Sequence, residues 1–327
     1  MAKRAIFMVT VAGTNITAPL LPILHSLTVT DNVGTHSDTA NLDIDDTDGR
    51  IVLPQKGAPV IIALGWEGGG VRVVFTGTVD EVKSSGSRGS GRKLAITAKG
   101  MDTTQKPKQN QQRHFDNKTV KDILTESGQT AGVTNIQVDP SLANIKRVYF
   151  DMRDESFIHV GERIAREVGG NFRIQGTQAF LTKRGSGYTS FVTATWGDNL
   201  HSWDIAPDLG RTQFNAVRAR WYDKKQAKWM DTEEATRNQT QARHDHRHTK
   251  ADEDEAKQQT GSDKATTERD AAEGTCTIEG NTAAIPDGLC IIAGARAGID
   301  GPYRIESVTH TFSRGGGFVT ALSLKKA

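Results

Sequence analysis

The sequence predicts a mainly β protein with α+β content, in which two similar small β-barrels flank a middle α+β domain. Three observations lead to this fold class. Short runs of alternating apolar and polar residues fill both ends of the chain, helical periodicity is confined to the middle, and a three-strand pattern recurs. The length of 327 residues suits about two domains, or more if each is small.

The recurring pattern occupies residues 57–99 and residues 288–325. Each copy begins with an apolar strand bounded by glycines, Gly57–Gly65 in the first and Gly288–Gly294 in the second. A turn, a long second strand, another turn and an alternating third strand follow in both copies. The offset between the copies changes by only a few residues, so we interpret them as one three-strand unit used twice.

Residues 1–104 are predicted to form the first β-barrel. Runs of β-forming residues alternate with clusters of Gly, Asn and Asp that favour turns. Many short antiparallel strands without a long helix favour a small closed barrel, because closure removes exposed edges. The expected strand residues are Ile6–Val11, then Ile23, Leu27 and Val29 on one face, then Ala40, Leu42 and Ile44.

Residues 105–190 are predicted to form the α+β middle domain. A first helix is expected to begin near Asp116 or Asn117 and to stop at Gly128. A second helix is expected to begin near Asp154 and to end at Gly169-Gly170. The apolar stripe of this second helix is Phe157, Val160 or His159, Ile164, Ala165 and Val168. A polar connection is expected over 101–112. Strands are expected at Asn135–Val138, Tyr149-Phe150, Asn171–Ile174 and Ala179–Thr182.

Residues 191–327 are predicted to form the second β-barrel, with a polar acidic insertion at 231–273. The barrel strands are expected to include Phe214–Tyr222 before the insertion and Thr275–Glu279 after it. The insertion has seven alanines as its only apolar residues, and it carries 12 acidic and 7 basic residues. Such a segment buries too little surface to offset the entropy of ordering it, so it is expected to be mobile, or helical or extended against a neighbour.

Charge and cysteine content restrict the class of protein. With 41 Lys and Arg against 39 Asp and Glu, the formal charge is +2, which argues against a dedicated nucleic-acid binder. Cys276 and Cys290 lie outside any Cys-x-x-Cys pattern, which favours a reducing compartment over a disulfide framework. No apolar run reaches the roughly 18 residues of a transmembrane helix, and the apolar run after Lys3-Arg4 ends too early for an exported leader.

Four segments, in this order, carry a family resemblance: Ser37-Asp38 through Asp45-Asp46-Thr47-Asp48-Gly49 to Gly57; Asp154-Glu155-Ser156-Phe157 to Gly169-Gly170; Phe214-Asn215-Ala216-Val217 with Trp221-Tyr222-Asp223; and Gly301-Pro302-Tyr303-Arg304-Ile305 through His310 to Gly317-Phe318. With these residues the chain resembles the late control protein D family, the baseplate hub proteins of contractile-tailed phages and related contractile injection systems. The resemblance covers about residues 5–325, but the insertion is not anchored to it residue by residue.

The resemblance implies a structural baseplate hub of a contractile phage tail or tail-like particle, and not an enzyme. It implies a homotrimer whose two barrels per chain form a pseudo-sixfold ring, which matches a sixfold tail tube to a threefold spike. The implied partners are the tail tube protein and the central spike protein, with the tape measure protein and baseplate wedge or sheath proteins as further candidates. No membrane, specific nucleic acid or cofactor is implied, although DNA would pass through the lumen.

The implied location is the baseplate of the virion tail, after assembly in the cytoplasm of the host bacterium. An acidic insertion that faced the lumen would repel the phosphates of passing DNA. The alternative function is a tail-associated cell-wall (peptidoglycan) hydrolase, which needs a carboxylate pair in a cleft, one member with a raised pKa. A third hypothesis, a stand-alone nucleic-acid-binding barrel, predicts salt-sensitive DNA binding.

The histidine run His244-Asp245-His246-Arg247-His248 is the most conspicuous candidate metal site. On a helix, His244 and His248 would share a face while His246 would point away, and the sequence offers no evident third ligand. We therefore interpret the run as solvated polar surface. Asp43–Gly49 resembles a calcium loop, but counting from Gly49 as position six places Ile44 at position one, so a β-turn is the better interpretation.

Other candidate residues also have simpler interpretations. Ser84–Gly91 lies between two strands and not before a helix, so a hairpin loop is favoured over a phosphate site. His310 has no adjacent nucleophile or orienting carboxylate in the sequence, which favours a structural role. A last group could stack nucleic-acid bases: Trp221 and Trp229 with Arg218, Arg220 and Lys228. We favour the simpler interpretation that these residues form part of a barrel core and its solvated face. No catalytic, cofactor-binding or metal-ligating residue is predicted.

Overall fold

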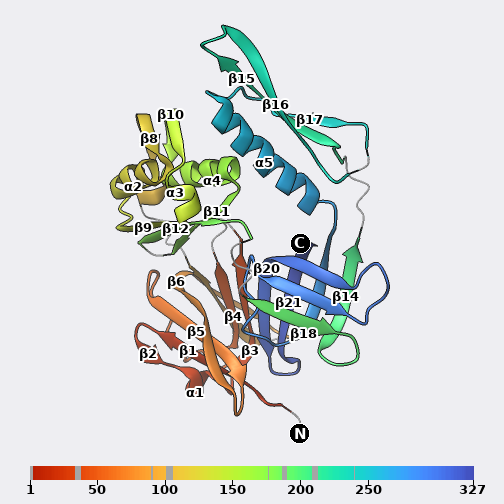
Figure 1. The fold of residues 1–327 in the computed structure, drawn as a ribbon. Helices are drawn as coiled ribbons and strands as arrows, with labels where there is room; N and C mark the ends of the chain where they lie inside the picture. The colour runs from red at the N-terminus through yellow and green to blue at the C-terminus, as the bar shows by residue number, and fades with distance from the viewer. Residues whose placement is uncertain are drawn as a thin grey trace. The chain divides into compact units, whose positions relative to one another are not determined.

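The computed structural model describes residues 3–33, 38–89, 91–100, 106–175, 177–185, 190–207, 213–238 and 240–327. Expectations for Gly34, Ser37, Ser90, 101–105 and Gly176 lie outside these ranges. None of the described helices is both long and apolar enough to cross a membrane. The chain divides into two compact units. Unit 1 is 1–103, 187–205 and 274–324, and unit 2 is 104–186, 206–273 and 325–327 (Figure 1).

Unit 1 consists almost wholly of strands. They form one continuous 13-stranded sheet, accompanied by the short helix α1 (Thr17–Leu20). The strands are β1 (Ala5–Val11), β2 (Thr14–Asn15), β3 (Leu24–Asn32), β4 (Thr39–Asp45), β5 (Pro59–Trp66), β6 (Gly70–Ser87), β7 (Gly91–Lys99), β13 (Phe191–Thr195), β14 (Leu200–Ala206), β18 (Glu273–Glu279), β19 (Leu289–Ala293), β20 (Gly301–Ser313) and β21 (Gly317–Lys326).

Two sets of six strands in unit 1 have the same order of neighbours. The first is β3-β4-β7-β6-β5-β1, and the second is β14-β18-β21-β20-β19-β13. Each strand of the first set therefore has a counterpart at the same place in the second, and the repeat predicted from the sequence corresponds to β5–β7 and β19–β21. One pairing differs, because β1 runs antiparallel to β5 whereas β13 runs parallel to β19. The closing of each set into a barrel stays a prediction.

Each set supplies most of the residues of one apolar core, and Phe318 of β21 belongs to the first core. In the first set, the alternating residues Ala40, Leu42 and Ile44 of β4 are buried as predicted, together with Leu27 and Val29 of β3. The second core takes apolar side chains from β13, β14 and β18 to β21 and holds both cysteines, which are free thiols. The alternation in the sequence thus identified the buried face of the strands correctly.

Unit 2 combines short sheets with the longer helices. Its sheets have the orders β10-β8, β11-β12-β9 and β16-β15-β17. The elements are a 3-10 turn (Lys106–Lys108), β8 (Asn110–Thr119), α2 (Val120–Thr130), β9 (Asn135–Val138), α3 (Pro140–Ala143), β10 (Lys146–Ser156), α4 (Phe157–Val168), β11 (Gly170–Gln175), β12 (Gln178–Lys183), β15 (Ala216–Asp223), β16 (Lys228–Ala235), β17 (Arg243–Asp245) and α5 (Glu253–Arg269).

The predicted start of the first helix is wrong. Asp116 and Asn117 lie in β8, and α2 begins only after Thr119, whose side chain caps the helix in a reciprocal pair with Asp122. Polar strand β8 was missed because it lacks apolar alternation and is held by its pairing with β10. Gly128 does not stop the helix. It lies within α2, where a Cβ atom would come 2.3 Å from Ile136 Cδ1.

The second predicted helix is confirmed in its course. α4 buries Phe157, Val160 and Ile164 on one face and ends at Gly169, which has a φ of 67°. Its N-cap is Ser156 and not Asp154. Glycine suits this C-terminal position because it adopts the left-handed conformation without steric cost.

The acidic insertion is part of unit 2. Residues 231–273 supply the end of β16, the whole of β17 and α5, and α5 packs along β15 and β16 (Figure 1). The buried positions of α5 are Ala256, Gln259, Thr260 and Ser262. The sequence assigned Phe214–Tyr222 to the second barrel, but β15 pairs with β16 and β17 in a separate sheet. The predicted boundaries at residues 104 and 190 stay a prediction.

Candidate functional site

The joint between β20 and β3 connects the two six-strand sets. The first part of β20, Gly301–Arg304, pairs with β19, and its second part, Ser307–Ser313, pairs antiparallel with β3. This joint extends one set directly into the other by backbone hydrogen bonds. It shows that the edge of β3 and the far half of β20 are complementary surfaces.

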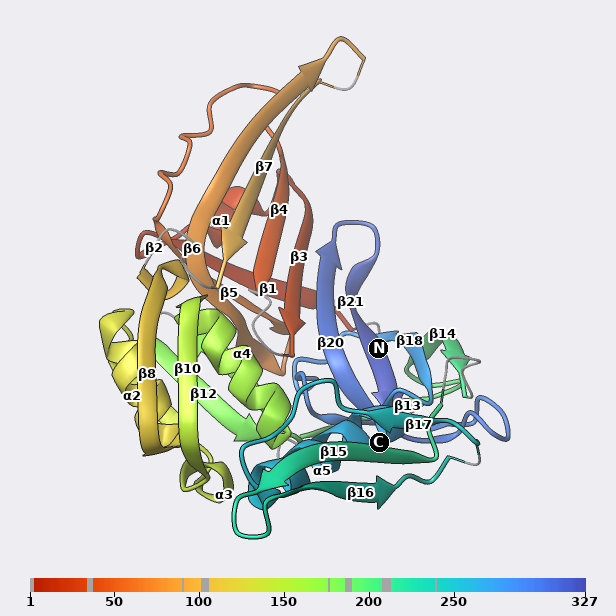
Figure 2. The ribbon, with the colours of Figure 1, turned by 90° about the horizontal axis from the view of Figure 1, so that it is seen from above.

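The counterparts of β3 and β20 are β14 and β6. β5 pairs with β6 up to Thr78, and β7 pairs with β6 from Thr78 to Ser87, so that β6 and β7 run side by side as a long hairpin (Figure 2). Beyond Val79, the edge of β6 opposite β7 has no partner strand among the described residues. β14 ends the pairing path of the described strands. Unit 1 therefore presents two strand edges, on β6 and on β14, that correspond to the joined edges of β20 and β3.

An apolar groove lies beside the first core of unit 1. Its volume is about 850 Å³, and its lining includes Ile16, Leu20, Ile23, Val52 and Leu53. Val52 is 89% exposed, which is unusual for a branched apolar side chain. The groove is a candidate contact surface.

A charged pocket of about 1020 Å³ lies within unit 2, between α4, α5 and β10. Arg147 is only 3% exposed, and its guanidinium lies 3.2 Å from Glu167 Oε2 and 3.8 Å from Glu255 Oε1. Burial raises the pKa of Glu255 and lowers the pKa of Lys250. Glu255 is thus a carboxyl with a raised pKa in a cleft, which is the feature that a hydrolase would need. Arg147, however, lies between the two acids as their shared ion-pair partner.

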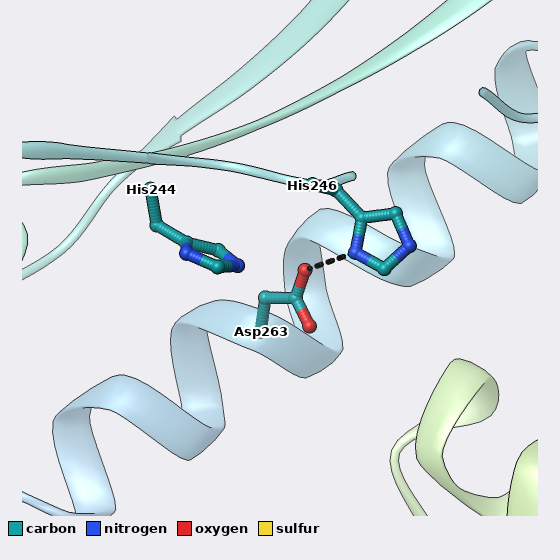
Figure 3. A group of neighbouring side chains, drawn as sticks. All are labelled: His244, His246 and Asp263. Atoms are coloured by element: carbon teal, nitrogen blue, oxygen red, sulfur yellow. Dashed lines mark hydrogen bonds and ion pairs between the residues drawn. The ribbon is translucent and has the colours of Figure 1, made fainter. Parts of the chain in front are cut away.

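His244, His246 and Asp263 form a cluster in this unit, and two of them, His246 and Asp263, also line the charged pocket. Figure 3 shows the two imidazoles pointing from the strand toward α5, with the Asp263 carboxylate between them. One potential ligand atom of each residue lies within 4.8 Å of the others, and His246 Nδ1 is 3.2 Å from Asp263 Oδ2. The three side chains are partly buried.

The cluster was missed because its secondary structure was wrongly assumed. His244 lies in β17, and the His246 N–H continues the strand pairing by donating to the Arg218 carbonyl, 2.7 Å away. On a strand, residues two apart share a face, so His244 and His246 point the same way. The third residue of the cluster, Asp263, comes from α5, which no local pattern in the histidine run could indicate.

Hydrogen bonds keep Asp263 ionised and oriented. Burial raises the pKa of Asp263, but its hydrogen bonds with His246 and Gln259 outweigh that effect and hold the pKa below its usual range. Gln259, one turn earlier on α5, donates from Nε2 to Asp263 Oδ1 at 2.8 Å. The other carboxylate oxygen, Oδ2, remains directed at His246.

The other predicted residues are not members of this cluster. Asp45 Oδ1 accepts the Thr47 N–H at 2.9 Å, and Gly49 donates to the Asp46 carbonyl, so Asp43–Gly49 ends in a turn. Ser84–Ser87 continues β6. His310 is 4% exposed, bonds Thr320 Oγ1 through Nδ1 at 2.9 Å, and has its pKa lowered by burial to about 4.

The tryptophan and arginine group is only partly as expected. Trp229 is 57% exposed and packs edge-on against Tyr222, so its assignment to a barrel core is wrong. Both arginines of the group are neutralised by acids, since Arg218 pairs with Asp245 and Asp231, and Arg220 also pairs with Asp231. Cations that are already paired in this way contribute little to a phosphate-binding surface.

The comparisons with known proteins agree over most of the chain. The family model described as "Phage tail baseplate hub (GPD)" matches residues 42–316. The probable baseplate hub protein of Escherichia phage 186 is 28% identical over 229 residues, covering 68% of this chain and 57% of the relative. The corresponding protein of Escherichia phage P2 is 29% identical over 233 residues, with the same coverage of 68% and 57%. The chain thus spans 57% of the length of these curated relatives.

Solved tail proteins share the fold. The tail protein from Neisseria meningitidis MC58 superposes with a TM-score of 0.73 at 15% identity, over 99% of this chain and 97% of that one. The 43 kDa tail protein of prophage MuSo2 from Shewanella oneidensis gives a TM-score of 0.73 at 14% identity, over 99% and 98%. A type VI secretion component of E. coli, c3393, gives 0.58 at 12% identity, over 93% and 74%. At such identities the likeness shows the fold alone.

Proposed function

Because the chain belongs to the phage tail baseplate hub (GPD) family, we propose that it is a structural hub that joins a sixfold tail tube to a threefold spike. The observation that carries this proposal is the identical order of neighbours in the two six-strand sets of unit 1. A chain with two equivalent six-strand sets needs only three copies to present six equivalent sets in a ring.

The unused strand edges supply a means of assembly. Within the chain, the far half of β20 joins the edge of β3. By the correspondence of the two sets, the far half of β6 in one protomer would join the edge of β14 in the next. Such strand addition uses backbone hydrogen bonds, and it would cover edges that otherwise invite nonspecific association. Three joints within chains and three between chains would close the ring.

The proposed partners follow from this ring. One face would bind the tail tube protein and the other the central spike protein, with the tape measure, wedge or sheath proteins as further neighbours. The proposed location is the baseplate of the virion tail, after assembly in the host bacterial cytoplasm. DNA would pass through the lumen without being bound. Whether residues 231–273 line that lumen stays a prediction.

Consecutive proline substitutions in β14 test the proposed joint. His201 and Ser202 are neighbours on β14, so their N–H groups face opposite edges of the strand. One of the variants His201→Pro and Ser202→Pro therefore removes a hydrogen bond to β18, which we call the inward bond. The other removes the proposed hydrogen bond to the next protomer, which we call the outward bond. The inward variant should lower the unfolding midpoint. The outward variant should fold normally but lose trimers at concentrations where the wild type forms them, as measured by sedimentation equilibrium.

Two outcomes would contradict the hub proposal. One is a wild-type chain that is monomeric at working concentration and does not assemble on tube or spike proteins. The other is a pair of proline variants that both assemble like the wild type.

The hydrolase alternative is tested separately. A zymogram with peptidoglycan should show no clearing for the wild-type chain, because Arg147 pairs with both Glu167 and Glu255. Clearing that is lost in Glu255→Gln but retained in Glu253→Gln, an acid in the same helix turn outside the pocket, would establish the hydrolase instead.

A further inference from the structure

We propose that His244, His246 and Asp263 form a binding site for a single divalent transition metal ion of the zinc class. Two imidazoles and one carboxylate are a donor set that such ions prefer, whereas magnesium and calcium prefer oxygen ligands alone. Three protein ligands leave one coordination position for water. The inference does not depend on the hub role.

The spacing of the ligand atoms fits this coordination. Zinc bonds of about 2.0–2.2 Å in a tetrahedron place ligand atoms on the order of 3.3 Å apart. His246 Nδ1 and Asp263 Oδ2 are already 3.2 Å apart. All three ligand atoms lie within 4.8 Å of one another, so small side-chain rotations bring them to that spacing. The side chains of His246 and Asp263 are 20% and 21% exposed, which leaves a path for an ion to enter.

The residues around the cluster hold the ligands in place. Gln259 is 4% exposed and fixes Asp263 by donating to Oδ1. Oδ2 faces His246 Nδ1, and a bound ion would take the place of the proton in the hydrogen bond between these two atoms. The ring of Phe214 lies 5.1 Å from the ring of His244 and restricts its orientation. Such neighbours of the ligands are part of most metal sites in proteins, because they reduce the freedom lost on binding.

Asp245 and His248, which lie beside the proposed ligands in the sequence, do not belong to the cluster. Asp245, between the two histidines, is bound by Arg218 and Arg243 and does not belong to the cluster. The ring of His248 is 6.2 Å from the ring of His246, and His248 is not part of the cluster either. The proposed site is therefore specific to two of the three histidines in the run.

The location of the cluster suggests what the ion does. β17 and α5 belong to a segment without any large apolar side chain, so neither element can supply one to a contact with the other. A bound ion would connect the strand to the helix through coordinate bonds. Metal binding of this kind adds directly to the stability of the folded state. The ion would serve as a structural cross-link of unit 2.

The test uses the full chain without a polyhistidine tag, stripped of metal by a chelator. Titration with zinc chloride followed by calorimetry should show one ion per chain. Cobalt(II) should give the visible absorption bands of a tetrahedral site, and zinc should raise the midpoint of thermal unfolding. These readouts are made on the wild-type chain and do not require any variant to fold.

Matched variants identify the ligands. His244→Ala and Asp263→Asn should each weaken zinc binding by ~100-fold or more, and Gln259→Leu, which affects only the orientation of Asp263, by about 10–100-fold. His248→Ala is the control from the same run and should bind like the wild type. Circular dichroism establishes that each variant is folded.

Three results would overturn the proposal. The first is the absence of stoichiometric zinc or cobalt binding to the wild-type chain. The second is unchanged binding in His244→Ala and Asp263→Asn. The third is an equal loss in His248→Ala, which would assign the binding to the exposed histidine run as a whole.

Discussion

Gly161 lies in the middle of α4, where the structure leaves no room for a side chain. A Cβ atom there would come within 2.1 to 2.4 Å of three ring atoms of Phe172. Phe172 is 1% exposed, and its ring packs edge-on against that of Phe157, with 5.5 Å between the centroids. The ring therefore cannot yield without disturbing the core of unit 2.

Gly161→Ala sets two effects against each other. Alanine is favoured over glycine inside a helix by about 1 kcal/mol. Overpacking a close-packed core costs roughly 1–3 kcal/mol, and contacts well inside the normal carbon–carbon separation of ~3.5 Å place this substitution at the upper end. We expect a net loss of about 2 kcal/mol in the free energy of unfolding, and a midpoint lowered by roughly 4–8 °C.

Gly261→Ala in α5 is the matched control. The nearest atom to a Cβ at Gly261 is Glu234 Oε1, 3.9 Å away, so there is room for the methyl group. The same substitution should here stabilise the protein by up to about 1 kcal/mol. Differential scanning calorimetry of the full chain measures both variants, and adding Phe172→Leu to Gly161→Ala should recover part of the loss.

The opposite signs of the two variants are the essential result. A Gly161→Ala chain that is as stable as the wild type, or that shifts in the same direction as Gly261→Ala, would refute the packing argument. It would also show that the close approach of α4 to Phe172 is not maintained in solution.

Two further predictions concern pH and helix capping. Burial lowers the pKa of His310 to about 4 in the folded chain, against 6.5 for an ordinary histidine. The contribution of the neutral His310 to the free energy of unfolding is therefore complete above about pH 6.5 and decreases as the pH falls toward 4. The total decrease is roughly 3 kcal/mol. Urea unfolding at pH 7 and pH 4.5 measures the free energy of unfolding at both pH values. In His310→Asn the decrease in this free energy between pH 7 and pH 4.5 should be smaller than in the wild type. An equal decrease would contradict the lowered pKa of His310. Thr119→Ala removes the cap of α2 and should cost about 1 kcal/mol in the same denaturation assay. Thr125→Ala, at a half-buried position inside α2 and outside the cap, should cost less; equal losses would argue against the capping contact.

Sequence patterns predicted those features that depend on neighbouring residues. The alternation in β4 identified its buried face, and the stripe of α4 with its terminal Gly169 identified that helix, because burial on one face imposes a period of 2 or 3.6 on the sequence. The sequence also predicted the recurrence of β5–β7 as β19–β21, and the two copies occupy equivalent places in the strand order.

Features that depend on distant residues were decided only by the tertiary structure. The polar strand β8 exists because β10 pairs with it, and the joint of β20 to β3 connects residues at opposite ends of the chain. The His244, His246 and Asp263 cluster required both the strand geometry of the histidine run and the arrival of α5 beside it. Composition showed that residues 231–273 could not form a hydrophobic core, but only the folded chain brings together the polar groups that hold this segment in place.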